Sequence, residues 1–191
     1  MIWSGPSSAR DRRWNFAILA VIALAAVYGA YAWWDSARIE RAFMVRAAEG
    51  ERALERIESI PSQGRTHLSP GESYAYGSRF PTSGPHDPTW TRSGVYDQPQ
   101  PPTQLVHALE HGNIVIYYDQ PGPKAIARFE AWADLYDGQW SGLVVTPEAG
   151  LGQAVVLTAW TRRLELDSFD PAAAAAFIDA YRGRGPENPV R

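Results

Sequence analysis

The chain has 191 residues, of which 45% are hydrophobic and 20% are charged, and it contains no cysteine. This composition is typical of a folded domain and excludes a disordered chain. The formal net charge is -3, with both signs mixed along the sequence, so no basic stripe is present to bind nucleic acid. Without cysteine, any bound metal must be held by nitrogen and oxygen ligands.

The first element is an apolar segment that is long enough to cross a membrane. Residues 14–34 read WNFAILAVIALAAVYGAYAWW, in which Asn15 is the only strongly polar side chain. As a helix this segment would span about 30 Å, the thickness of the hydrocarbon core of a bilayer. The arginine-rich sequence RDRR directly precedes it. The positive-inside rule therefore predicts a cytoplasmic tail over residues 1–13 and an extracytoplasmic domain after a single transmembrane anchor.

A cleaved signal peptide is the alternative interpretation of the same segment. Ala30-Tyr31-Ala32 has the small-x-small form of a cleavage site, and cleavage there would remove residues 1–32. The apolar run is longer than the roughly 7 to 15 residues usual for the apolar core of a signal peptide, which favours a retained anchor. Both interpretations place the rest of the chain outside the cytoplasm. With a retained anchor, the lipid bilayer is a partner of residues 14–34.

Residues 36–60 carry apolar side chains at helical spacing. Ile39 and Phe43 begin this pattern, and Glu and Arg residues fill the positions between the apolar ones. We predict a helical stalk here, with a bend or a weak point at Gly50 and an end at Pro61.

A long segment without periodicity follows over residues 63–102, rich in Gly, Pro, Ser and Thr. We predict that it is mostly loop, and a loop of this length in a compact domain is unusual unless it is functional. It contains His67 and His86. Pro81 and Pro85 restrict the backbone near His86, which reduces the entropy lost when that side chain is fixed as a ligand.

The rest of the sequence predicts a single α+β domain over residues 61–191, with a small, mainly antiparallel sheet packed by helices. The expected helix caps are Thr103, Gly112 and Asp170. The expected helices cover residues 103–111, 124–136 and 171–181. The expected strands cover residues 113–118, 143–146 and 154–160, and the last two could form a hairpin across residues 147–152.

The four histidines of the chain all lie in the loop and in the helix that follows it. Residues four apart on a helix share a face, so His107 and His111 lie on one side together with Glu110. Two leucines on the opposite side can attach this helix to the sheet. Neutral imidazole is a ligand for zinc, copper, nickel and iron. We therefore predict a site for copper or zinc formed by His67, His86, His107 and His111, with Glu110 as a fifth ligand or as a partner of a ligand.

Two other functions are compatible with these residues. The segment from His107 to His111 fits the H-x-x-E-H pattern of inverzincin metallopeptidases, in which Glu110 would activate water as general base. That mechanism needs a third ligand, for which Glu130 and Glu148 are the candidates. Alternatively, the chain is a non-catalytic interaction module of a membrane complex, in which the histidines only order the loop by hydrogen bonds.

Several separated segments of the chain resemble one known family. The sequence is similar to the domain of unknown function 3105 family of bacterial membrane-anchored proteins over about residues 60 to 187. All four histidines lie within matching segments. The resemblance implies an exported single domain and supplies no activity. The matching segments are Gly64-Arg65-Thr66-His67, Pro81-Thr82-Ser83-Gly84-Pro85-His86, Gly94-Val95-Tyr96, Leu105-Val106-His107-Ala108-Leu109-Glu110-His111-Gly112 with Tyr118-Asp119, Thr158-Ala159-Trp160, and Tyr181-Arg182-Gly183 with Pro186-Glu187.

Overall fold

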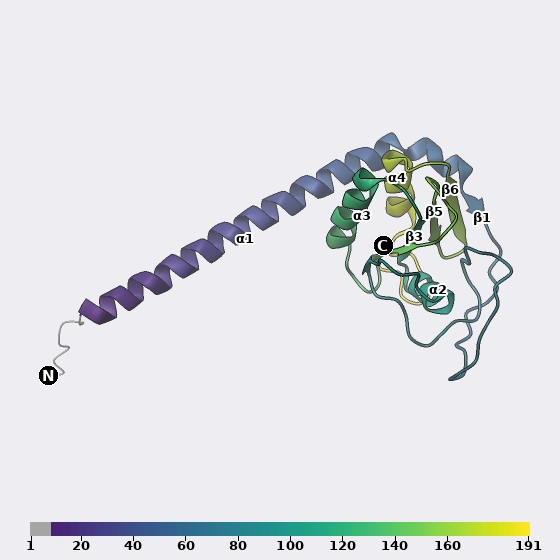
Figure 1. Cartoon of the computed structure of the whole chain (residues 1–191), viewed down its shortest axis with the longest axis horizontal. Coiled ribbons are helices and arrows are strands. Elements are labelled where there is room, and N and C mark those ends of the chain that lie inside the picture. The colour runs from purple at the N-terminus through teal and green to yellow at the C-terminus, as the bar shows by residue number, and fades with distance from the viewer. Residues whose placement is uncertain (1–8) are drawn as a thin grey trace. The chain divides into compact units, whose positions relative to one another are not determined.

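The computed structural model describes residues 9–191, and the side chains from residue 14 onward. Of the predicted cytoplasmic tail, residues 1–8 lie outside the described part. The chain divides into an N-terminal helical unit, which ends at Arg38, and a domain that comprises Ile39–Arg191 (Figure 1).

The N-terminal unit consists of one long apolar helix. Helix α1 (Ala9–Glu49) includes the whole segment predicted to span a membrane, and it continues into the domain. An 18-residue window of this helix has a mean hydropathy of 2.0. The side chains of residues 14–34 are all exposed. By length and composition this helix is a candidate to cross a membrane.

The predicted stalk is part of the domain rather than a separate element. Residues 36–60 comprise the end of α1, the 3-10 helix η1 (Glu51–Arg56) and the short strand β1 (Glu58–Ser59). Phe43 and Ala47 are buried in the main hydrophobic core. The break occurs at the predicted Gly50, where a side chain would overlap the backbone carbonyl of Ala172. Gly50 thus ends α1 and lets the chain pack closely against the last helix.

The domain is built on a mixed sheet, which confirms the α+β class. Among the described residues the sheet has six strands in the order β1-β6-β5-β3-β4-β2. The pairs β3·β4 and β2·β4 are parallel, and the other three pairs are antiparallel. The remaining strands are β2 (Gly94–Val95), β3 (Ile114–Tyr118), β4 (Leu143–Pro147), β5 (Val155–Ala159) and β6 (Arg162–Leu166), and the helices are α2 (Pro102–His111), α3 (Pro123–Leu135) and α4 (Pro171–Tyr181).

The predicted hairpin between residues 143–146 and 154–160 is wrong. Strand β3 lies between β4 and β5, and α3 connects β3 to its parallel neighbour β4. The hairpin partner of β5 is β6, across a tight turn in which Thr161 has a φ of 60°. The sequence did not indicate β6, because its charged side chains (RRLEL) interrupt the apolar pattern.

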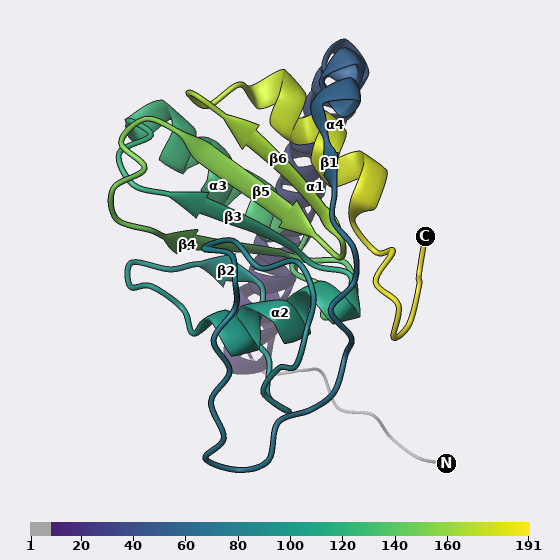
Figure 2. The same ribbon diagram turned by 90° about the vertical axis from the view of Figure 1, so that its right-hand side faces the viewer.

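Helices cover both faces of the sheet (Figure 2). Helices α3 and α4 and the end of α1 pack on one face, against alternate residues such as Ile114 and Ile116 of β3. The short helix α2 packs on the opposite face through Leu105 and Leu109, as predicted. This arrangement fixes the orientation of α2, so its polar side points away from the sheet.

The helix ends follow the predicted caps in two of three cases. Gly112 ends α2 in the left-handed conformation, with a φ of 100°. The carboxylate of Asp170 accepts hydrogen bonds from the backbone of Ala172 and Ala173 at the start of α4. Thr103 is not a cap, since α2 already begins at Pro102, a residue well suited to the first helical position.

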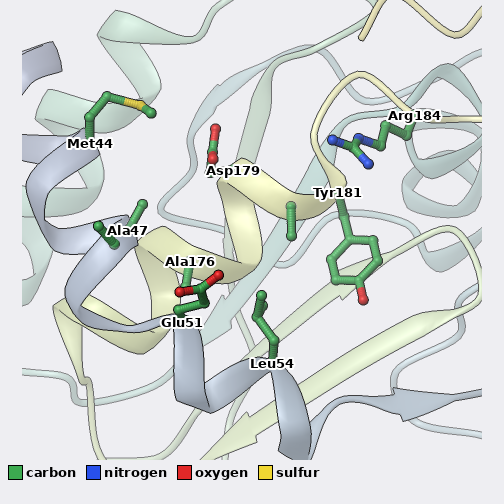
Figure 3. Close-up of a pocket in the computed structure, with 10 residues that line it drawn as sticks. Met44, Ala47, Glu51, Leu54, Ala176, Asp179, Tyr181 and Arg184 are labelled. Atoms are coloured by element: carbon green, nitrogen blue, oxygen red, sulfur yellow. The ribbon is translucent and has the colours of Figure 1, made fainter.

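A pocket of about 480 Å³ lies between the end of α1, η1 and α4 (Figure 3). Met44, Leu54 and Ala176 line its apolar part, and Glu51, Asp179 and Arg184 line its polar part. None of its lining residues is a histidine. The residues with potential metal chemistry therefore lie elsewhere in the domain.

Candidate metal centre

Helix α2 presents three buried polar side chains on the face that points away from the sheet. His107, Glu110 and His111 are only 3%, 4% and 2% exposed. They follow the helical spacing that the sequence predicted, and the segment between β1 and α2 covers them. A solvated helix face would leave these side chains in water. Their burial means that each needs a polar or metal partner.

The two loop histidines reach this face through a short backbone pairing. His67 and His86 form a parallel bridge, in which the backbone N–H of His86 donates to Thr66 and that of Leu68 donates to His86. The second of these hydrogen bonds is 2.8 Å long. The pairing fixes both histidines beside α2, with His86 fully buried and His67 exposed.

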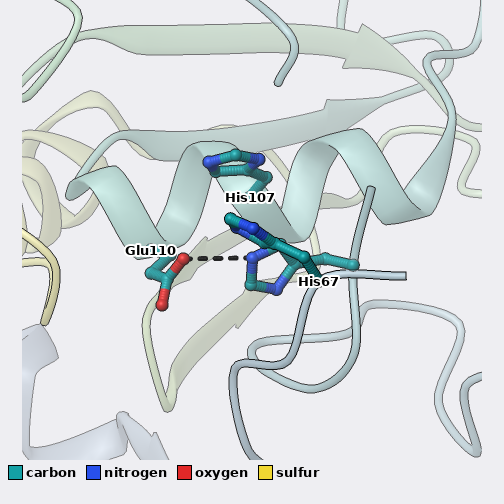
Figure 4. A group of neighbouring side chains, drawn as sticks. His67, His107 and Glu110 are labelled. Atoms are coloured by element: carbon teal, nitrogen blue, oxygen red, sulfur yellow. Dashed lines mark ion pairs between the residues drawn. The ribbon is translucent and has the colours of Figure 1, made fainter. Parts of the chain in front are cut away.

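A first group of possible ligands is formed by His67, His86, His107 and Glu110 (Figure 4). One ligand atom from each lies within 4.8 Å of every other. Nε2 of His86 and a carboxylate oxygen of Glu110 are 3.0 Å apart. Ligands of a tetrahedral zinc ion are about 3.3 Å apart, given metal–ligand distances of 2.0 to 2.1 Å. This pair is therefore close to the spacing of two neighbouring metal ligands.

The backbone selects the tautomer of two of these histidines. Nδ1 of His86 lies 2.8 Å from the carbonyl oxygen of Gly84, and Nδ1 of His107 lies 2.7 Å from that of Asp87. A carbonyl oxygen can only accept, so both Nδ1 atoms carry hydrogen and donate. In the neutral rings each Nε2 then carries a lone pair directed into the group. Nε2 of His86 is buried and has no hydrogen bond among the described residues, despite its short distance to Glu110.

A second group shares His107 with the first and consists of His107, His111 and Glu187. Nε2 of His111 lies 3.0 Å from a carboxylate oxygen of Glu187, and Nε2 of His107 lies 4.0 Å from the same oxygen. Glu187 is 40% exposed and belongs to the segment after α4. Trp90 and Trp140 cover the ring of His111, with ring centroids at 4.7 and 4.3 Å.

Burial keeps the three inner histidines neutral near pH 7. It lowers the pKa of His86 and of His107 below the ordinary value of 6.5. Burial and then the neighbouring His107 lower the pKa of His111 to about 4. Burial and then Glu187 raise the pKa of Glu110. Neutral imidazoles are the protonation state that a metal ion requires of histidine ligands, whereas a metal ion would have to displace the proton that the raised pKa favours on Glu110.

The predicted site residues are thus brought together, but not around one point. Three of the four histidines join the first group with Glu110, whereas His111 belongs to the second group. The ligand candidates Glu130 and Glu148 are not members of either group, and Glu148 pairs with Arg79 at 2.7 Å.

Glu187 is a site residue that the sequence alone does not predict. Glu187 is far from the histidines in sequence, and its Pro-Glu context does not predict a ligand. Its backbone N–H donates to the carbonyl of Glu110 at 3.3 Å, and the guanidinium of Arg65 donates to Pro186 next to it at 3.3 Å. These contacts, together with the hydrogen bond from the backbone N–H of Gly183 to the carbonyl of Gly112, hold the C-terminal segment at the site.

Comparison with known proteins gives a family for this domain and no activity. The family described as "Protein of unknown function (DUF3105)" matches residues 67–191, which include all four histidines and Glu187. Neither a curated protein nor a solved structure matches the chain. The chain therefore belongs to the DUF3105 family.

Proposed function

We propose that this chain is a membrane-tethered protein whose extracytoplasmic domain binds a copper(II) or zinc ion through its histidine cluster. In this proposal residues 14–34 cross the membrane and the domain lies outside the cytoplasm. The ligands are His67, His86 and His107, with Glu110 as the fourth.

The orientation of the buried imidazoles is the observation that carries this proposal. His86 and His107 each donate a hydrogen bond from Nδ1 to a backbone carbonyl, and Nε2 of His86 lies 3.0 Å from Glu110. Two lone pairs that face each other across 3.0 Å repel unless a proton or a metal ion lies between them, and a metal ion bound by both atoms would satisfy them together. Metal-bound histidines commonly donate their second nitrogen to a carbonyl in this way.

The chemistry of the donor atoms limits the choice of metal. The chain has no cysteine and only two methionines, so no soft sulfur ligands are available to favour copper(I). Imidazole and carboxylate suit both zinc and copper(II), of which copper(II) binds more tightly to a given set of nitrogen and oxygen ligands. Four ligands at the observed spacing suit the tetrahedral geometry of zinc.

Calorimetric titration of the full chain in detergent tests the proposal. We expect saturable binding of zinc or copper(II) to the wild type, and loss of this binding in a variant that combines His86→Ala and His107→Ala. Glu130→Gln is the control, because Glu130 lies outside both groups. Absence of binding of either ion to the wild type would contradict the proposal.

A metal-dependent hydrolase is the second candidate, and Glu187 favours it. His107, His111 and Glu187 provide two imidazoles and a carboxylate, and Glu110 lies between the two histidines in the H-x-x-E-H pattern. If Glu110 is a general base, Glu110→Gln keeps the metal and abolishes hydrolysis. If Glu110 is a ligand, Glu110→Gln instead weakens metal binding by at least about 10-fold, as loss of a supporting contact already does.

A further inference from the structure

We propose that the cluster is a two-position metal relay, in which one ion at a time occupies either of two sites that share His107. The His86 position consists of the first group, and the Glu187 position consists of the second. This inference rests on the proposed function, because it describes how an ion is held and moved within the same cluster.

The shared histidine makes the two positions mutually exclusive. His107 belongs to both groups. Its Nδ1 already donates to the carbonyl of Asp87 at 2.7 Å, so only Nε2 is free to bind a metal. One lone pair binds one ion. Two ions could share this ring only if Nδ1 lost its proton and its hydrogen bond, and two cations this close together would also repel each other.

Each position is complete enough to hold an ion with ligands of its own. In the His86 position, Nε2 of His86 and a carboxylate oxygen of Glu110 are 3.0 Å apart. In the Glu187 position, Nε2 of His111 and a carboxylate oxygen of Glu187 are also 3.0 Å apart. Both pairs have the spacing of neighbouring metal ligands, and His107 lies between them.

The four rings contact one another, and each position includes one exposed residue. The centroid distances are 5.0 Å from His67 to both His86 and His107, 4.9 Å from His86 to His107, and 4.6 Å from His107 to His111. His67 is exposed in the His86 position and Glu187 is 40% exposed in the Glu187 position, while the other three rings are buried. An ion can therefore pass from one position to the other by ligand exchange while it remains bound to His107. This arrangement suits the transfer of an ion better than its permanent storage.

Titration of the full chain in detergent with copper(II), followed by electron paramagnetic resonance, tests the relay. We expect one ion per wild-type chain. His86→Ala and His111→Ala should each still bind one ion, with affinities within about 10-fold of the wild type but with different spectra, since the ion occupies the position that remains. His107→Ala removes a ligand from both positions and should lower the affinity for copper(II) by more than about 100-fold. This loss exceeds the roughly 10- to 100-fold that is typical when a residue hydrogen-bonded to a metal ligand is removed.

Matched variants separate the effect of ligands from the effect of folding. Thr103 is on the same helix but outside both groups, so Thr103→Ala should bind copper(II) with the affinity of the wild type. If an alanine variant at His86, His107 or His111 does not fold, the glutamine variant at the same position replaces it, because glutamine keeps a hydrogen-bonding side chain. Two ions per wild-type chain, or a His107→Ala loss no larger than that of His111→Ala, would overturn the relay while leaving metal binding intact. Absence of any bound ion would instead overturn the proposed function.

Discussion

At the scale of single residues, the backbone orients the histidines for metal binding. The carbonyl groups of Gly84 and Asp87 accept from Nδ1 of His86 and His107, and this leaves the Nε2 atom of each ring available to a metal ion. Protonation of these rings would place positive charges in a buried cluster. The stability of the metal-free domain should therefore depend on pH.

We expect the metal-free chain to lose stability as the pH falls from about 6.5 toward about 4. The pKa of His111 is lowered to about 4, and those of His86 and His107 are also lowered, so the unfolded chain binds more protons in this range. Each such proton changes the free energy of unfolding by about 1.4 kcal/mol per pH unit. The raised pKa of Glu110 acts in the opposite direction, above its ordinary 4.5, and offsets part of the effect.

Urea denaturation in the presence of a chelator measures this dependence. His111→Gln should have a shallower decline than the wild type over the same range, since it removes one of the three groups. A free energy of unfolding that stays constant between pH 6.5 and 4 would contradict the assignment of neutral, buried imidazoles.

At the scale of secondary structure, the sequence predicted local features well and non-local ones poorly. The helical face of His107 and Glu110, the leucine side of α2 and the cap at Gly112 depend on residues close in sequence, and all are found. Strand neighbours depend on contacts between distant residues, and β3, β4 and β5 are similarly apolar, so their order was not predicted. The location of Glu187 at the site was missed for the same reason.

The contact between α2 and the C-terminal segment can be tested at Gly185. A side chain there would overlap the carbonyl of Glu110 and the backbone nitrogen of Gly112. We expect Gly185→Ala to displace the segment that carries Glu187, at a cost of about 1 to 3 kcal/mol in the free energy of unfolding, as for other overpacked sites. Gly185→Ala should also abolish metal binding at the Glu187 position, because Glu187 is displaced with the segment.

Gly77→Ala is the matched control, because a side chain at Gly77 has no atom within 4 Å and neither glycine has a positive φ. This variant should differ from the wild type by less than about 0.5 kcal/mol in chemical denaturation. Equal stability of the two variants would mean that the C-terminal segment is not held against α2.

At the scale of the whole molecule, an apolar helix and a domain with buried histidines are parts of one chain. The helix α1 passes from the apolar segment directly into the domain core, where Phe43 is buried. Under the proposed function, residues 14–34 would tether the domain to the membrane.

Membrane fractionation tests the tether. We expect the full chain to remain in the membrane after alkaline carbonate extraction. N-terminal sequencing of the extracted protein should give a start before residue 14, so that the apolar segment is retained. Leu24→Arg lies in the middle of the apolar segment and should release part of the protein, because arginine at the centre of a membrane helix costs about 2.5 to 3.5 kcal/mol. Val45→Arg, an exposed apolar position on the same helix outside residues 14–34, should have no effect. A soluble chain that begins at residue 33 would instead support the signal peptide.

X-ray absorption at the zinc edge of the zinc-loaded full chain tests the central claim most directly, because it reports the atoms bound to the metal. The proposed site predicts imidazole nitrogens and a carboxylate oxygen at about 2.0 to 2.2 Å, with three imidazoles in the His86 position and two after His86→Ala. A zinc ion surrounded only by oxygen ligands, or a chain that retains no zinc, would contradict the claim.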